Sequence, residues 1–416
     1  MGNARKAKSH QVETNDVRPP EGETCPDDQG LSLFQLAGHS LERDGESRTA
    51  FPRALAGAPK IPYEYAQMEG EELDERIASA KERLVQSTVI LGHHYQRDEI
   101  VKFADFRGDS FKLSQLAACR DSAEYIVFCG VHFMAESAEI LSGPHQKVIL
   151  PNLEAGCSMA DMASIDDVEC CWEYLVELCS GGLVPVTYMN SAASLKAFCG
   201  RNGGVVCTSS NAPKVLRWAF KQGKRVLFFP DEHLGRNTAD KVGLDLAKTI
   251  VWDPSESTGG HDGEDLMRAE LVLWQGFCSV HQRFTVDQIR QARQRFPGIN
   301  VVVHPECSRE VVQEADSDGS TEFIADMVTR APSGSQWAVG TEINLVNRLA
   351  KANPDKLVFC LDPVVCPCST MYRIHPAYLA WVLEELLEGK VINQITVDHE
   401  TASWARIALQ RMLSIS

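Results

Sequence analysis

Short apolar runs that alternate with helical stretches are the feature that most constrains the fold of this chain. From about residue 70 onward, runs such as 124–130 and 147–152 each follow a stretch with helical spacing, of which 71–86 is an example. Strands joined by helices of ten or more residues are typical of parallel sheets built from βαβ units. The sequence therefore predicts an α/β fold.

The apolar runs fall into three groups, which predicts three similar α/β units, each with a parallel sheet. The strands are expected within 87–96, 124–130 and 147–152 in the first unit, 183–190, 204–212, 225–231 and 270–276 in the second, and 299–307, 321–326, 336–342 and 356–362 in the third. The groups share this pattern rather than obvious sequence identity.

Changes in composition set the expected boundaries. The polar, proline-containing N-terminal part is expected to be a mostly mobile extension. The acidic, glycine-rich stretch 253–267 is typical of a surface insertion between two strands of the middle unit. The predicted organisation is an extension at 1–69, a first unit at 70–165, a second at 166–285, a third at 286–390, and a C-terminal helix at 391–416 that packs on the first unit.

Three cysteines stand just after the last expected strand of each unit: Cys157, Cys278 and Cys368. The carboxyl ends of parallel strands are where open α/β sheets place their chemistry, so three thiolates could meet at one centre. Three thiolates on a four-iron cluster would leave one iron open to a substrate, as a Lewis acid. For any single cysteine, a buried apolar role is the commoner one. The pair of Cys366 and Cys368 leaves open which of the two points at the centre.

Ionisable groups also follow the expected strands. His93 and Tyr95 come after the first strand, and His304 and Glu306 after the first strand of the third unit. An imidazole suits acid–base work near neutral pH, and a tyrosine with its ordinary pKa near ~10 would donate a proton. The alternative is that these groups cap helices or bond to neighbours.

Small hydroxyl clusters occur at the loop positions GDS (Ser110), TSSN (208–211) and GST (Ser320 and Thr321). Hydroxyls beside backbone N–H groups at helix N-termini suit phosphate and carboxylate groups. As plain helix caps they would need no ligand. No P-loop and no G-x-G-x-x-G sequence is present, so nucleotide binding by those routes is unsupported.

Bulk composition narrows the function classes. A net charge of −16 and a pI of about 5.2 disfavour nonspecific nucleic-acid binding. No apolar run reaches the ~18 residues of a membrane span, and the N-terminus has no apolar core of a secretory signal. We expect a cytoplasmic protein without nucleic-acid or membrane partners, whose 14 cysteines are buried thiols or metal ligands rather than disulfides.

Taken together, the motifs resemble those of the quinolinate synthase family, iron–sulfur enzymes of de novo NAD biosynthesis. The resemblance runs from about residue 70 to the C-terminus, in family order. The matching motifs are HHYQRDEI (93–100), GDSFKLS (108–114), GVHFMAE (130–136), GCSMADM (156–162), TYMNSAA (187–193), CTSSNA (207–212), WQGFCSVHQRF (274–284), HPEC (304–307), GSTEFI (319–324), VGTE (339–342) and CPCSTMYRI (366–374).

The resemblance implies a condensing enzyme that joins iminoaspartate and dihydroxyacetone phosphate into quinolinate, with loss of phosphate and two waters. It implies three α/β units around a pseudo-threefold axis, with a [4Fe-4S] cluster and the active site at the centre. By the family motifs, the cluster ligands are Cys157, Cys278 and Cys368; the proton-handling groups are His93, Tyr95, His304 and Glu306; and the substrate contacts are Ser110, Tyr188, Asn190, Ser209, Ser320 and Thr321. Ser210 is an alternative to Ser209.

The resemblance also implies partners: L-aspartate oxidase as the source of iminoaspartate, and the iron–sulfur assembly machinery. It leaves the oligomeric state open, with a homodimer as one form. Two other functions compete with this interpretation. One is a cluster-dependent hydro-lyase acting on another small hydroxy acid, which would not need dihydroxyacetone phosphate. The other is an iron or redox sensor, which would not need Glu306.

Overall fold

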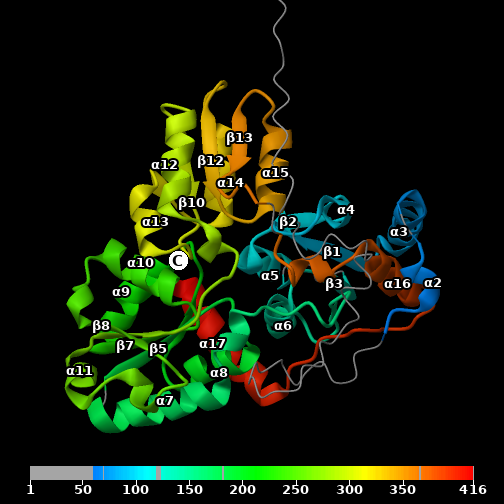
Figure 1. Ribbon diagram of the computed structural model, residues 1–416. Coiled ribbons are helices and arrows are strands. Elements are labelled where there is room, and N and C mark those ends of the chain that lie inside the picture. The colour runs from blue at the N-terminus through cyan, green and yellow to red at the C-terminus, as the bar shows by residue number, and fades with distance from the viewer. Residues whose placement is uncertain (1–59, 69, 119–122, 180–181, 365–366, 416) are drawn as a thin grey trace, which may run out of the picture. The chain divides into compact units, whose positions relative to one another are not determined.

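The structure is a computed structural model that describes residues 60–68, 70–118, 123–179, 182–364 and 367–415 (Figure 1). The expected extension at 1–69 lies almost entirely outside the described residues, as does Cys366. Within the described part of the chain, no helix is both long enough and apolar enough to cross a bilayer.

Three parallel sheets organise the described residues. The first three strands of each sheet have the spatial order 2-1-3. In the first and third sheets the fourth strand lies beside the third, whereas in the second sheet the fifth strand takes that place and the fourth lies at the edge. The sheets are β2-β1-β3-β4, with β1 Thr88–His93, β2 Phe106–Gly108, β3 Tyr125–Cys129 and β4 Lys147–Ile149; β6-β5-β7-β9-β8, with β5 Leu183–Tyr188, β6 Val205–Cys207, β7 Arg225–Phe229, β8 Thr249–Trp252 and β9 Leu271–Trp274; and β11-β10-β12-β13, with β10 Asn300–Val303, β11 Ser317–Asp318, β12 Gln336–Gly340 and β13 Leu357–Cys360.

Helices connect the strands and cover the sheets. The α-helices are α2 Tyr63–Ala66, α3 Glu71–Leu84, α4 Asp98–Val101, α5 Ser110–Ala118, α6 His132–Leu141, α7 Ile165–Cys179, α8 Ala193–Arg201, α9 Ala212–Gln222, α10 Glu232–Val242, α11 Gly263–Arg268, α12 Val286–Arg295, α13 Arg309–Glu314, α14 Thr321–Arg330, α15 Ile343–Ala352, α16 Pro376–Leu387 and α17 His399–Ile415, and the 3-10 turns are η2 Ala160–Met162, η3 Leu246–Lys248, η4 Ser257–Gly260, η5 His281–Arg283 and η6 Met371–Arg373. The predicted fold of three similar parallel α/β units is confirmed.

The strands are parallel because their connections are helices, and their sequences are apolar because both faces are covered. Every residue of β5 is buried, and β3 and β7 each have four consecutive buried residues. Parallel strands covered on both faces read as nearly continuous apolar runs. For this reason, these strands could be predicted from the sequence.

One predicted strand is wrong. Residues 321–326 begin the helix α14, and the strand of this region is the two-residue β11. Ser320 caps the helix by accepting the Phe323 N–H at 3.3 Å, and Ile324 and Val328 face the core one helical turn apart. The local cap and the i, i+4 spacing favour a helix over the short apolar run.

Besides β11, two further strands were not predicted, and both carry a weak apolar signal. In β2 only Gly108 is buried, and in β8 only Trp252 is buried. The acidic stretch 253–267 lies between β8 and β9 and contains η4 and most of α11. The added edge strand β8 makes the second sheet five-stranded.

The C-terminal segment contacts two units, and the prediction that its helix packs on the first unit is wrong in its main contact. Before the helix, Ile395 N–H donates to the Val148 carbonyl at 2.8 Å, beside the edge strand of the first sheet. The helix α17 itself packs chiefly on α8 of the second unit (Figure 1). A Cβ on Gly200 of α8 would lie 2.0 Å from the Trp404 carbonyl oxygen, so the two helices approach too closely there for any other residue.

Polar contacts link each pair of units near the carboxyl ends of the strands. Trp274 Nε1–H of the second unit donates to the Met162 carbonyl of the first at 2.8 Å. Asn237 Nδ2 of the second unit donates to the Pro305 carbonyl of the third at 2.9 Å. Gln96 Nε2 of the first unit donates to the Met371 carbonyl at 3.1 Å. These side chains bring the strand ends of the three units to one place.

Candidate active site

The first strand of each sheet ends in a pair of polar side chains two residues apart. Because the three sheets share one topology, the pairs occupy equivalent positions at the carboxyl edge, where open α/β sheets bind their ligands. The pairs are His93 and Tyr95 at the end of β1, Tyr188 and Asn190 at the end of β5, and His304 and Glu306 after β10. All six side chains line one cavity.

The same cavity, with an empty volume of about 680 Å³ including its mouth, is lined by residues from all three units. Twelve of the thirteen predicted site residues line it, the six above together with Cys157, Cys278, Cys368, Ser110, Ser209 and Thr321. Further lining residues include Asp109, Val131, Phe133, Met134, Met159 and Met371. The position of these residues agrees with the predicted site, and their roles stay predictions.

The three thiol loops have one local structure. The carbonyl oxygens of Cys157, Cys278 and Cys368 each accept the N–H of the residue four positions on, at 3.0, 3.1 and 2.9 Å. A 3-10 turn begins three residues after each cysteine. The threefold repeat therefore extends to the loops that present the sulfur atoms, and Cys368 is the member of the third loop that matches Cys157 and Cys278.

The thiols are half-buried in a region poor in cations. Burial raises the pKa of Cys157 to about 12, and the nearby Cys368 adds to the effect. Burial, Glu306 and Cys368 raise the pKa of Cys278 well above its usual range. Thiolates are costly here unless a cation offsets their charge, which is the condition that an iron centre meets.

The spacing of the donors fits a multi-iron group better than a single ion held by the three thiols. In the described part of the chain, the one group of three ligand atoms within 4.8 Å of one another is that of Cys278, His281 and Glu306. The three sulfur atoms are spread more widely around the cavity. A cluster with several irons can bind sulfur atoms that are too far apart to bind one ion together.

Hydroxyl groups stand at helix N-termini around the cavity. Ser110 is the first residue of α5, Thr321 the first of α14, and Ser209 lies three residues before α9. Between the two alternatives, Ser209 lines the cavity and Ser210 is exposed. Ser320 is the predicted site residue that does not line the cavity, because its buried hydroxyl caps α14.

His93 and Tyr95 are held in their neutral forms. Burial, with the neighbouring His94 and Arg348, lowers the pKa of His93 well below its usual range. Its Nδ1 accepts the Tyr95 N–H at 3.1 Å, so the ring proton is on Nε2. Burial and then Glu306 raise the pKa of Tyr95 well above its usual range. Tyr95 is therefore a proton donor at neutral pH.

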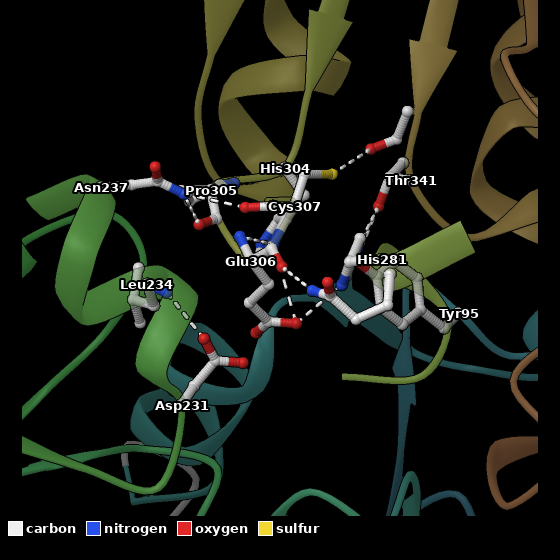
Figure 2. Close-up of polar contacts among 12 residues, drawn as sticks. Tyr95, Asp231, Leu234, Asn237, His281, His304, Pro305, Glu306, Cys307 and Thr341 are labelled. Atoms are coloured by element: carbon white, nitrogen blue, oxygen red, sulfur yellow. Dashed lines mark hydrogen bonds and ion pairs between the residues drawn. The ribbon is translucent and has the colours of Figure 1, made fainter. Parts of the chain in front are cut away.

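Glu306 is an ionised group at the cavity wall. Burial acts to raise its pKa, but His304, His281 and Tyr188 outweigh burial and lower it below its usual range. His281 Nδ1 lies 2.7 Å from Glu306 Oε2 (Figure 2). Burial lowers the pKa of His304 to about 3, so this imidazole is neutral. The third unit therefore offers a buried carboxylate beside a neutral histidine.

Two side chains of the second unit lie beside the Glu306 loop, and one of them supports it (Figure 2). Asn237 Nδ2 donates to the carbonyls of Pro305 and Cys307, both at 2.9 Å, on either side of Glu306 (Figure 2). Asp231 caps α10 through Leu234 N–H at 2.6 Å, and its second oxygen is buried without a hydrogen-bond partner among the described residues. Burial and the Glu306 charge raise the pKa of Asp231 well above its usual range.

Comparisons with known proteins agree with this geometry. The family described as quinolinate synthetase A protein matches residues 75–414. The quinolinate synthase of Corynebacterium glutamicum is 58% identical over 364 residues, which cover 86% of this chain and 92% of the relative. This chain belongs to the quinolinate synthase family. The quinolinate synthases of Acidobacterium capsulatum and Streptomyces coelicolor are 56% and 52% identical, over 84% and 88% of this chain and 95% and 94% of theirs.

Membership of the quinolinate synthase family makes this protein an enzyme and confirms the resemblance seen in the motifs. The matched range contains every predicted site residue and the stretch 253–267. It begins after the expected extension at 1–69.

The quinolinate synthase motifs of the sequence include His281, Thr341 and Glu342, for which the sequence predicted no role. His281 is three residues after Cys278, and Thr341 and Glu342 end the VGTE motif. Glu342 Oε1 accepts the Cys368 N–H at 3.3 Å, and burial raises the pKa of Glu342 to about 7. The available signal was position: each residue follows a strand of its unit at the carboxyl edge. Asp231 carried the same signal after β7.

Proposed function

We propose that this enzyme condenses iminoaspartate with dihydroxyacetone phosphate to give quinolinate, with release of phosphate and two waters. The observation that carries the proposal is the single cavity lined by three thiols and by the polar pairs at the ends of β1, β5 and β10. A condensation with two dehydrations needs several proton donors and acceptors around one substrate. The three polar pairs supply different proton donors and acceptors.

Cys157, Cys278 and Cys368 would hold a [4Fe-4S] cluster. The iron without a protein ligand would serve as a Lewis acid toward a substrate oxygen when the cluster is bound. The repeated thiol loops support this ligand set, because each unit offers one sulfur in the same local setting.

Ser110, Ser209, Ser320 and Thr321 would bind the phosphate and carboxylate groups. No lysine or arginine is among the described residues that line the cavity. Anions would therefore be held by hydroxyls, backbone N–H groups and the positive ends of helices such as α5 and α14. Ser320 would contribute to anion binding indirectly, because it caps the N-terminal end of α14.

The proton-handling roles follow from the charges of the side chains. Glu306, the ionised carboxylate, would remove protons from the substrate, with His304 beside it. Tyr95, the neutral phenol, would donate protons, with His93 as a second donor through Nε2–H. Tyr188 and Asn190 would orient the substrate between these groups.

Iminoaspartate is an imine, which water hydrolyses readily, so a supply by L-aspartate oxidase close to this enzyme would favour the reaction. The cluster would come from the iron–sulfur assembly machinery. A cytoplasmic location belongs to the same proposal.

The test is a quinolinate assay on protein purified without oxygen and checked for iron and acid-labile sulfide. Oxaloacetate with ammonium would supply the imine, and dihydroxyacetone phosphate would be the second substrate. Quinolinate that forms only when both are present supports the proposal. Turnover of a small hydroxy acid without dihydroxyacetone phosphate would instead identify a hydro-lyase.

A further inference from the structure

Lys196 of α8 is a buried cation to which the proposed mechanism gives no role. Its side chain has a relative exposure of 0%, and its ammonium group donates to the Ser191 carbonyl. This acceptor is neutral, so the hydrogen bond leaves the positive charge uncompensated. A buried charge without a close counter-ion is costly. The position of Lys196 therefore needs an explanation beyond packing.

The ammonium group lies directly behind the wall of the cavity. Lys196 Nζ is 5.6 Å from the centre of the Phe133 ring, and Phe133 lines the cavity. Ser191 directly follows Asn190, which lines the cavity together with Tyr188. A single layer of residues therefore separates the positive charge from the space where a ligand would bind.

Hydrogen bonds fix the part of the wall that Lys196 contacts. The hydroxyl of Ser191 donates to the Tyr188 carbonyl at 2.7 Å, and Thr187 Oγ1 donates to that hydroxyl at 2.9 Å. Glu136 of the first unit accepts the N–H of Ala193, the first residue of α8, at 3.0 Å. The ammonium group is thus held at a defined place behind a rigid turn.

Lys196 carries its charge at neutral pH. Burial lowers its pKa to about 8, and Glu136 and then Cys199 oppose this effect. An anion bound in the cavity would raise the pKa further, because a nearby opposite charge favours the charged form. Salt screens buried charges only weakly, so the field of the ammonium group reaches the cavity.

The cavity itself has groups that repel anions and few that attract them. Its described lining contains Glu306, Asp109 and the three thiols, but no lysine or arginine. Its imidazoles His93 and His304 are neutral, because burial lowers the pKa of each. The substrates of the proposed reaction carry carboxylates and a phosphate. A cation behind the wall would offset the repulsion that such ligands meet.

We propose that Lys196 is a specificity-determining residue that attracts the substrate through the cavity wall, so that the site favours doubly over singly charged anions. It does not touch the substrate, since Phe133 and the turn that carries Tyr188 and Asn190 lie between them. The inference rests on the proposed function and deepens it, because it names negative charge as a property by which the substrate is selected.

The test compares the binding of succinate and succinamate, which have the same length but differ by one negative charge at neutral pH. Calorimetric titration of anaerobically purified full-length protein with its cluster would give the Kd of each. The unchanged protein is expected to bind succinate more tightly. In Lys196→Met this preference should fall about 10- to 20-fold, the effect of one charge pair at about 10 Å with an effective dielectric constant of about 20.

Thr187→Val is the matched control. Thr187 is also fully buried and donates to Ser191 Oγ, so its loss disturbs the same turn without changing its charge. It should weaken both ligands by a similar factor and leave the preference for succinate unchanged. Lys196→Gln loses the charge but keeps a hydrogen-bond donor. It should behave like Lys196→Met, and it provides the test if the methionine variant does not fold.

An unchanged preference for succinate in the Lys196 variants would overturn the proposal, as would an equal fall in Thr187→Val. Absence of succinate binding to the unchanged protein would overturn it too. The quinolinate assay tests the proposed function separately, because ligand binding needs no turnover. If the unchanged protein forms no quinolinate but the Lys196 variants lose the preference, the proposed reaction fails while the selection of charge by Lys196 stands.

Discussion

The Glu342 side chain fixes the backbone of Cys368, because Glu342 Oε1 accepts the Cys368 N–H at 3.3 Å. The other carboxylate oxygen accepts the Asn344 N–H at 2.8 Å and caps α15. The third thiol loop is therefore tied to the end of a helix rather than left as a free turn. Cys368 holds a defined place at the cavity wall.

We predict that the three thiols of the cavity are each required for the cluster. Cys157→Ser, Cys278→Ser and Cys368→Ser are expected to lose the cluster, and Cys366→Ser is expected to keep it. Iron and acid-labile sulfide per chain, about four of each in the intact centre, are the measurement. Cys170→Ser is the control, since that thiol is exposed on α7. Loss of the cluster in Cys366→Ser, but not in Cys368→Ser, would refute this ligand set.

Glu306→Gln should stop the reaction without removing the cluster. The substitution keeps the size of the side chain but removes the base, and we expect kcat to fall about 10²- to 10⁴-fold. Glu310→Gln, four residues on and exposed, should have no effect. The measurement is quinolinate formed per cluster. An active Glu306→Gln enzyme would mean that another group is the base.

Asn237→Ala should change the position of Glu306 without removing any group that contacts the substrate. The substitution leaves the buried carbonyls of Pro305 and Cys307 without their shared donor, at a cost of about 1–3 kcal/mol in the free energy of unfolding. We also expect kcat to fall about tenfold, because the loop that carries Glu306 loses its support.

Asn353→Ala is the matched control for that prediction. Asn353 is also buried and donates to a carbonyl, that of Leu349, at 2.9 Å. It should show a comparable loss of stability in denaturant unfolding with unchanged kcat. Equal kcat values for the two variants would show that Asn237 serves the fold alone.

The buried Lys196 should make stability depend on pH. Burial lowers its pKa from 10.5 to about 8, although Glu136 partly opposes this. Between these two values the unfolded chain binds more protons than the folded one, so this contribution to stability rises with pH from about 8. Below about pH 8 the cost of burying the charge is of the order of 3 kcal/mol.

Lys196→Met removes that titration, so the free energy of unfolding of the unchanged protein should rise relative to that of the variant between about pH 8 and 10.5. Urea unfolding at several pH values measures the difference. A constant difference would mean that Lys196 titrates alike in both states. Because Lys196 also donates to the Ser191 carbonyl, beside Tyr188 and Asn190, KM should rise in the variant.

The sequence predicted strands correctly where their residues are almost completely buried. It did not predict two strands that are only partly buried. The strands β3, β5 and β7 were visible because their residues are buried almost throughout. The strands β2 and β8 were not, since each has one buried residue. The helix α14 was read as a strand because its first residues, 321–326, form a short apolar run whose cap precedes it.

The candidate site could be predicted where its residues follow strands or belong to family motifs. Cys157, Cys278 and Glu306 lie in loops that follow strands, so the topology rule brings them to one edge. Contacts between units have no such local signal: Tyr95 and Thr341 are 246 residues apart, yet their hydroxyls lie at 2.8 Å. In the sequence, nothing distinguishes Thr341 from an ordinary residue before a helix. For the same reason, the packing of α17 on α8 could not be predicted.

The repeated strand order has a consequence for the kind of molecule this enzyme can recognise. A ring of three identical subunits would present three copies of one polar pair to its axis. One continuous chain is free to place a different pair in each sector, here imidazole with phenol, phenol with amide, and imidazole with carboxylate. Three equivalent sulfur donors can thus share a centre with three unlike sets of polar groups, which suits a ligand that has no symmetry of its own.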